Sequence, residues 1–190
     1  MLLLVGLGNP GSNYTNTRHN IGFKIIDAIN THFKLTKQKP KFKGLLTTGN
    51  IDEKKIYAIK PLTFMNNSGT AIKELIDYFK IDAKNVFVFH DDLDIDFGKI
   101  KAKFGGSSAG HNGVESIDKF IGKDYSRVRI GIGHPKQKKK VNNHVLEDFK
   151  EDEEEKIKEI TENIVKQLPN LIGKKIDLFS SKVNQDLNGI

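Results

Sequence analysis

Val86-Phe87-Val88-Phe89 is a run of four apolar residues that leads directly into His90-Asp91-Asp92. A strand without polar alternation is typical of a parallel sheet that is covered on both faces, because neither side of the strand then meets water. Leu2–Leu7 has the same character, and Lys99–Phe104 and Arg127–Gly133 also have strand composition. These segments predict a sheet with a buried centre.

Segments whose apolar residues recur at helical spacing lie between these strands. The predicted helices are Ile21–Phe33, Ile72–Phe79, Val114–Ile121 and Ile157–Leu168. Proline is a usual stop signal, so Pro169 predicts the end of the last helix, which we place at about residues 151–168. Strands that alternate with helices predict an α/β fold.

A hairpin breaks this alternation early in the chain. Gly44–Ile51 and Lys55–Lys60 read as two strands joined by a turn at Asp52-Glu53. We therefore expect a mixed, largely parallel twisted sheet with helices on both faces. The chain has 190 residues, which fits a single domain spanning 1–190. Residues 34–43 and 136–143 are expected to be surface loops.

The composition favours a polyanionic partner. The formal net charge is +7 and the pI is about 9.4, and the lysines gather at 34–43, 99–103 and 136–140. There is no cysteine, which excludes disulfides, thiolate metal sites and thiol nucleophiles. The apolar start Met1–Val5 lacks a basic flank and is too short for a signal peptide or a membrane span. We expect a cytoplasmic protein that has no membrane partner.

The first loop contains a motif with a second interpretation. Gly6-Leu7-Gly8-Asn9-Pro10-Gly11 matches the glycine pattern of dinucleotide-binding folds. That motif requires a helix to begin inside it, so that the helix N-terminus faces the pyrophosphate. Here the first helical stripe begins only at Ile21. A nicotinamide-dependent oxidoreductase is therefore disfavoured.

Polar residues follow the predicted strands, where α/β folds place their sites. They are Asn9, Tyr14 and His19 after the first strand, Phe64-Met65-Asn66 after the hairpin, His90-Asp91-Asp92 after the apolar run and His111-Asn112 after the next loop. Each has a common structural explanation as a turn former or helix cap. Four such groups at successive strand ends instead indicate a candidate active site.

The order of five segments resembles the bacterial peptidyl-tRNA hydrolases. The segments are Gly6–Gly11 with Tyr14 and Thr17-Arg18-His19-Asn20-Ile21-Gly22, then Lys60–Gly69, His90–Asp94, Gly110–Gly113 and Arg127–Pro135. Together they span residues 1 to about 150. The resemblance implies an esterase that frees tRNA from prematurely released peptidyl-tRNA and works as a monomer without metal or cofactor.

The resemblance also implies residue roles. His19 would be the general base that activates water. Asp91 would orient the imidazole of His19 through a hydrogen bond to its other ring nitrogen. Asn9 would separate blocked from free aminoacyl-tRNA. The residues implied to bind the 3′ end and the acceptor stem are Tyr14, Phe64, Asn66, Asn112, Lys103 and Arg129. Phe64 could also be a core residue.

Two positions depart from the family pattern. Glu115 stands where a basic residue is usual, and Ser107-Ser108-Ala109 replaces a more glycine-rich stretch. Both lie in or beside the loop expected to touch RNA, so they affect the expected RNA contacts rather than the chemistry.

Two other function classes remain open from the sequence. A metallohydrolase could draw its ligands from His19, His90, Asp91, His111 and His134, although no paired-ligand spacing supports it. An RNA-binding protein without catalysis would need only the positive charge. A hydrolysis assay and chelation separate these classes from the esterase.

Overall fold

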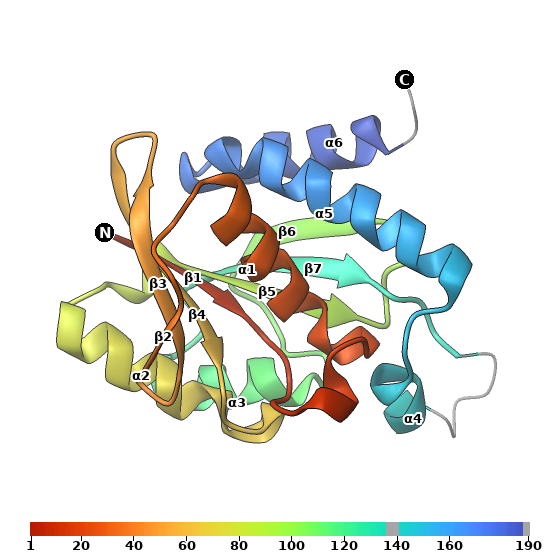
Figure 1. Ribbon diagram of the computed structural model, residues 1–190, viewed down its shortest axis with the longest axis horizontal. Coiled ribbons are helices and arrows are strands. Elements are labelled where there is room, and N and C mark those ends of the chain that lie inside the picture. Colours follow the sequence, from red (N-terminus) through yellow and green to blue (C-terminus); the bar gives the residue numbers. More distant parts are fainter. Residues whose placement is uncertain (136–140, 188–190) are drawn as a thin grey trace.

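The computed structural model describes residues 1–135 and 141–187, which form seven strands and six α-helices (Figure 1). The strands are β1 (Leu2–Gly6), β2 (Lys39–Lys41), β3 (Gly44–Ile51), β4 (Lys54–Pro61), β5 (Val86–Asp92), β6 (Ile100–Phe104) and β7 (Ser126–Gly131). The helices are α1 (Ile21–His32), α2 (Ser68–Phe79), α3 (Asn112–Ile121), α4 (Val141–Leu146), α5 (Glu151–Ile172) and α6 (Ile176–Asp186). No helix in these described ranges is long and apolar enough to cross a membrane.

All seven strands belong to one sheet with the order β2-β3-β4-β1-β5-β7-β6. The four central strands β4, β1, β5 and β7 pair in parallel. The β3–β4 hairpin, β2 and β6 pair antiparallel at the flanks. The predicted mixed sheet of a single α/β domain is confirmed.

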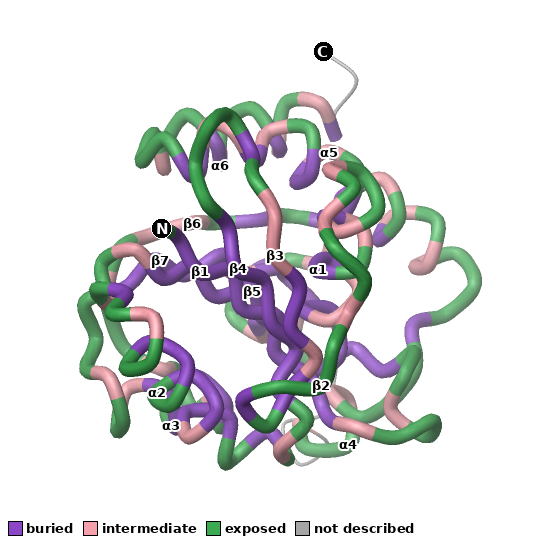
Figure 2. Tube along the Cα trace, turned by 60° about the vertical axis from the view of Figure 1, so that its left-hand side comes forward, coloured by how far each residue is buried: buried purple, intermediate pink, exposed green. Residues whose placement is uncertain are grey.

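Helices cover both faces of the sheet, as predicted. The side chains of Leu2 and Leu4 pack with α1, α5 and α6, whereas Leu3 and Val5 pack with α2 and α3 on the opposite face. Because successive side chains of a strand point to opposite faces, burial on both sides requires the continuous apolar run. Figure 2 shows the buried central strands running through the middle of the molecule.

Gly6 at the end of β1 and Gly22 in α1 allow the helix to pack closely against the sheet. A side chain on Gly6 would collide with the carbonyl of Gly22, and one on Gly22 would collide with Leu7 and with the carbonyl of Phe89. The start of α1 therefore lies directly against β1 and β5. Only short 3-10 turns precede it, at Ser12–Tyr14 and Arg18–Asn20. No helix begins within the Gly6–Gly11 motif, so the helix that a dinucleotide site needs is absent there.

The predicted end of the C-terminal helix was wrong. Helix α5 continues through Pro169 to Ile172, and α6 follows it after a short turn. Proline inside a helix costs about 3 kcal/mol, but the apolar stripe continues past it. Leu171 and Ile172 are buried, and burying two such side chains contributes about 3–6 kcal/mol.

Both predicted surface loops contain regular structure. The short strand β2 lies inside 34–43 and forms one edge of the sheet. Helix α4 begins at Val141, inside 136–143. The lysine cluster at 136–140 lies outside the described residues.

The opposite edge of the sheet is β6, whose outward backbone groups are bonded to side chains of α6. Ala102 N–H donates to Ser180 Oγ at 2.9 Å, and Ile100 N–H donates to Asn184 Oδ1 at 3.0 Å. The amide of Asn184 also donates to the carbonyl of Ile100 at 2.9 Å. Ser180 and Asn184, one helical turn apart, thus hydrogen-bond to alternate residues of β6.

Candidate active site

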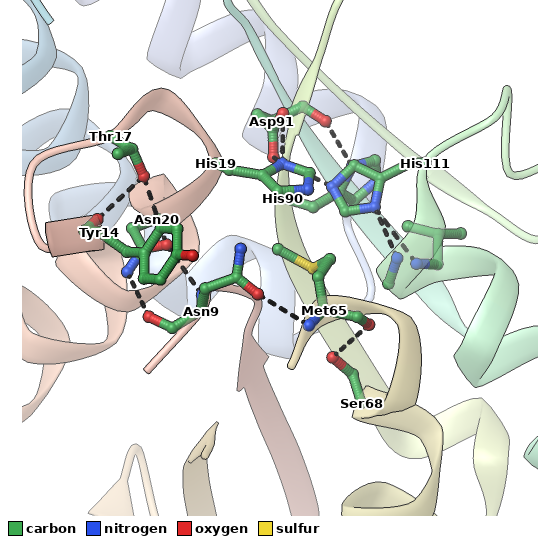
Figure 3. Close-up of polar contacts among 12 residues, drawn as sticks. Asn9, Tyr14, Thr17, His19, Asn20, Met65, Ser68, His90, Asp91 and His111 are labelled. Carbon is green, nitrogen blue, oxygen red and sulfur yellow. Dashed lines mark hydrogen bonds and ion pairs between the residues drawn. The ribbon is translucent and has the colours of Figure 1, made fainter. Parts of the chain in front are cut away.

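The predicted pair His19 and Asp91 lies at the carboxyl end of β5 (Figure 3). His19 sits in the 3-10 turn Arg18–Asn20, which the glycine-mediated packing of α1 holds against β5. Its Nδ1 lies 2.8 Å from Oδ1 and 3.0 Å from Oδ2 of Asp91. The expected hydrogen-bond contact is confirmed.

The contact fixes the proton of the imidazole. Asp91 is an acceptor, so Nδ1–H of His19 donates and Nε2 carries the lone pair. Burial lowers the pKa of His19, but the charge and hydrogen bond of Asp91 outweigh burial and raise it above the ordinary value. Burial raises the pKa of Asp91, but His19 and His111 hold it well below its usual range.

Arg18 anchors the turn that carries His19. Its buried guanidinium donates to Glu153 at 2.7 Å and to the carbonyls of His144 and Glu147. The acidic start of α5 therefore holds the His19 segment in place. Sequence reasoning assigned no role to Arg18.

Asn20 orients Asn9 from the same turn. The backbone N–H of Asn9 donates to Asn20 Oδ1 at 2.8 Å, and Asn20 Nδ2 donates to the Asn9 carbonyl at 2.9 Å. The side-chain oxygen of Asn9 accepts from Met65 N–H at 2.8 Å. Asn9 therefore presents its amide nitrogen, a donor, toward the catalytic pair (Figure 3). Asn20 belongs to the Thr17–Gly22 motif, but the sequence did not predict that it positions Asn9.

Two hollows meet at His19. The first, of about 300 Å³, is here called the acidic hollow because Asp91, Asp92 and Asp94 line it. The second, of about 230 Å³, is called the amide hollow. The residues shared by both are His19, Asn112, Asn142 and Val145. A substrate whose scissile ester lies at His19 can thus extend into both hollows.

The amide hollow contains most of the predicted substrate-binding residues. Asn9, Phe64, Asn66 and Asn112 all line it. Phe64 is 62% exposed, so the alternative that it is a core residue was wrong. Tyr14 is half-buried in the adjacent 3-10 turn, and neither hollow includes its side chain in its lining.

The predicted basic pair lies on a different surface, between β6, β7 and α6. Lys103 and Arg129 line a shallow hollow there together with Lys101. Slight burial, followed by the charges of Arg129 and Arg127, lowers the pKa of Lys103. Arg129 is partly neutralised, since its Nε donates to Asp92 at 2.7 Å. The cations gather near one another, as an anion site requires.

Arg127 anchors the loop that precedes α3. Its buried guanidinium donates to the carbonyl of Ser107 at 2.7 Å and to Asp118 at 2.6 Å. In this loop Ala109 has a φ of 49°, a left-handed conformation that costs a residue with a side chain about 1–2 kcal/mol. A glycine at this position would avoid that cost.

Glu115 is a surface residue of the first turn of α3. Its carboxylate pairs with Lys119 at 2.9 Å, one turn along the helix. An acidic side chain in a first helical turn also suits the helix dipole. The departure from a basic residue thus has a local structural explanation.

His19, Asp91 and His111 place possible metal-ligand atoms within 4.8 Å of one another. Asp91 Oδ1 already accepts from His19 Nδ1–H at 2.8 Å, and His111 Nε2 lies 3.0 Å from it. A cation between them would have to replace these contacts.

Comparison with known proteins identifies the family of the chain. A family model described as peptidyl-tRNA hydrolase matches residues 3–189. The chain is 71% identical over 184 residues to a peptidyl-tRNA hydrolase of Pelagibacter ubique, covering 97% of this chain and 99% of that one. It is 44% identical to that of Bartonella henselae, covering 97% and 96%. The crystal structure of the Acinetobacter baumannii peptidyl-tRNA hydrolase superposes with a TM-score of 0.90 at 34% identity, covering 97% and 94%. The chain belongs to the peptidyl-tRNA hydrolase family.

Proposed function

We propose that this peptidyl-tRNA hydrolase cleaves its ester by general-base catalysis, with His19 Nε2 taking a proton from the attacking water. The observation that carries the proposal is the Nδ1 contact of His19 with Asp91. That contact leaves the basic nitrogen at the junction of the two hollows. An ester has a better leaving group than an amide, so activated water suffices without a side-chain nucleophile.

The proton cycle needs only this pair. Water adds to the ester carbon while its proton moves to His19, and Asp91 stabilises the imidazolium that forms. The imidazolium then returns the proton to the departing ribose oxygen. Asn66 and Asn112, which both line the amide hollow, offer amide donors for the substrate and for the negative oxygen of the intermediate.

Asn9 supplies a physical basis for selecting blocked substrates. Its side-chain oxygen is used by Met65 N–H, so its free groups are amide donors. An N-acylated substrate carries an additional carbonyl that can accept from such a donor. A free α-ammonium has only donors and would also lose its hydration.

The decisive experiment measures release of tRNA from N-blocked aminoacyl-tRNA and from the unblocked form. We expect the blocked form alone to be cleaved. Cleavage of both forms at equal rates would overturn the proposed selection. We further propose that the enzyme acts in the cytoplasm and that it is a monomer. Sedimentation of the purified chain checks whether it is a monomer.

Phe64 and Tyr14 offer aromatic faces for bases of the 3′ end, and the hollow between β6 and α6 offers a phosphate clamp. Phe64 is exposed beside Asn66 in the amide hollow, where an unstacked base can lie on its ring. Lys103 and Arg129 are the proposed phosphate ligands. Phosphate contacts add affinity without reading sequence.

Replacing Lys103 by alanine should weaken tRNA binding through loss of one phosphate contact. We expect the slope of log affinity against log salt to flatten by about 0.7–0.9, because fewer counterions are released. KM should rise more than kcat falls. Arg129→Ala should flatten the slope less, since Asp92 already neutralises part of its charge. Salt titrations with a catalytically inactive variant measure both slopes.

Glu115→Lys provides the control for the clamp. Glu115 faces solvent and pairs with Lys119, so we expect the added charge to leave the slope nearly unchanged. A slope that steepens would place RNA over α3. If neither Lys103→Ala nor Arg129→Ala changes the slope, the clamp has been assigned to the wrong residues.

EDTA should leave the rate of hydrolysis unchanged, because the proposed base needs no metal-bound water. The assay compares initial rates after chelation and dialysis with those of untreated enzyme. Loss of activity that zinc restores would favour the metallohydrolase, with His19, Asp91 and His111 as ligands.

A further inference from the structure

His111 joins helix α3 to the catalytic carboxylate. We propose that His111 is a positioning residue whose Nε2–H shares the Asp91 carboxylate with His19 and thereby keeps His19 available as a base near neutral pH. The inference rests on the proposed role of His19 and extends it to a third side chain.

The hydrogen bonds of His111 determine its tautomer. Its Nδ1 accepts from the backbone N–H of Gly113 at 3.1 Å and of Val114 at 3.3 Å. A nitrogen that accepts two N–H groups carries no proton, so the ring proton is on Nε2. That nitrogen lies 3.0 Å from Asp91 Oδ1. One imidazole therefore caps the start of α3 and donates to Asp91.

Asp91 consequently divides its acceptor capacity between two histidines. Both His19 Nδ1–H and His111 Nε2–H reach the same oxygen, Oδ1. A donor to a carboxylate stabilises its charge and weakens its pull on a second proton. Removing the His111 donor should therefore strengthen the hold of Asp91 on the His19 imidazolium. His19 would then remain protonated to higher pH.

His90 lies beneath His111 and adds no charge. Its ring centroid is 4.8 Å from that of His111, edge to face, and its Nδ1 lies 2.7 Å from the carbonyl oxygen of Asp91. Burial, followed by the neighbouring imidazole of His111, lowers the pKa of His90 to about 3. His90 is thus a neutral ring packed edge to face against His111, and nearby Arg127 also opposes its protonation.

Among the described residues, two further carboxylates that line the acidic hollow are engaged with other partners. Asp92, next on β5, pairs with Arg129 of β7 at 2.7 Å. Asp94 and His134 pair with each other at 2.8 Å on the exposed rim of the acidic hollow. In the described part of the chain, His111 is therefore the ionisable side chain outside the His19–Asp91 pair that contacts the Asp91 carboxylate directly.

Two substitutions separate the roles of His111. Asparagine can place an oxygen near the position of Nδ1 and cap α3, but it is too short to reach Asp91. Glutamine can place a donor near the position of Nε2 but loses the cap. We expect His111→Asn to move the acid limb of the kcat/KM profile up by about one pH unit, lowering the rate about tenfold below the limb and little above it. His111→Gln should keep the limb near its original position and lower Tm instead.

The same shift should appear in an NMR titration of the His19 ring protons, which needs no substrate. His134→Asn is the matched control, because it removes a histidine from the same rim without a contact to Asp91. An unmoved limb in His111→Asn, or equal shifts in both His111 variants, would overturn the inference. The proposed function would fail separately, through an active His19→Ala enzyme.

Discussion

Replacing His19 by alanine lowers kcat by about 10²–10⁴-fold, because this is the usual contribution of a positioned general base. The fold should survive the change. Asp91 loses one buried partner but keeps His111, and removing one partner of a buried ion pair costs about 3–5 kcal/mol. That cost is smaller than the about 5–15 kcal/mol by which domains are stable.

Hydrolysis of N-blocked aminoacyl-tRNA by the purified variant measures this effect, with Tm recorded alongside. His32→Ala is the matched control, because His32 is an exposed histidine at the end of α1. Its rate should equal that of the unchanged enzyme. A His19→Ala enzyme with nearly full activity would remove His19 from the mechanism.

Replacing Asp91 by asparagine should lower kcat strongly, but less than the loss of His19, because the imidazole remains. The neutral amide cannot stabilise the imidazolium as the carboxylate does, and it can favour the wrong tautomer of His19. The sign of the pH effect is distinctive. Asp91 raises the pKa of His19, so without that charge the acid limb should move to lower pH. This is opposite to the expected effect of His111→Asn.

Asp92→Asn is the control for Asp91→Asn. Asp92 is the next residue of β5 and pairs with Arg129 rather than with His19. The acid limb of the kcat/KM profile of Asp92→Asn should stay in place. A limb that moves equally in both variants would mean that the general negative charge of the hollow, and not the contact with Asp91, sets the basicity of His19.

The contact between His19 and Asp91 was predictable because both follow strands of one sheet. Parallel strands place their carboxyl ends together, so chain order and the apolar runs indicated that these residues lie at the same edge of the sheet. The resemblance to the peptidyl-tRNA hydrolases implied that they pair. The parts played by Asn20 and His111 were not predictable in the same way. Their hydrogen bonds to Asn9 and Asp91 depend on the rotation of single side chains within short turns.

The C-terminal region shows a different limit. Pro169 is locally a stop signal, and only the burial of Leu171 and Ile172 against the sheet overrides it. Helix α6 buries just Phe179 and Val183 within its own length. The apolar stripe of this helix is therefore a weak signal in the sequence. The polar residues Ser180 and Asn184 find their hydrogen-bond partners only at the edge of β6.

That edge is open while the chain is being synthesised. Ile100 emerges from the ribosome 84 residues before Asn184, so at 5–20 residues per second the outward groups of β6 lack their partners for roughly 4–17 s. Unpaired strand edges invite pairing with another chain. A nascent chain that stops before α6 keeps this edge uncovered, with the exposed ring of Phe104 beside it. The last helix therefore determines when the sheet stops being a template for aggregation.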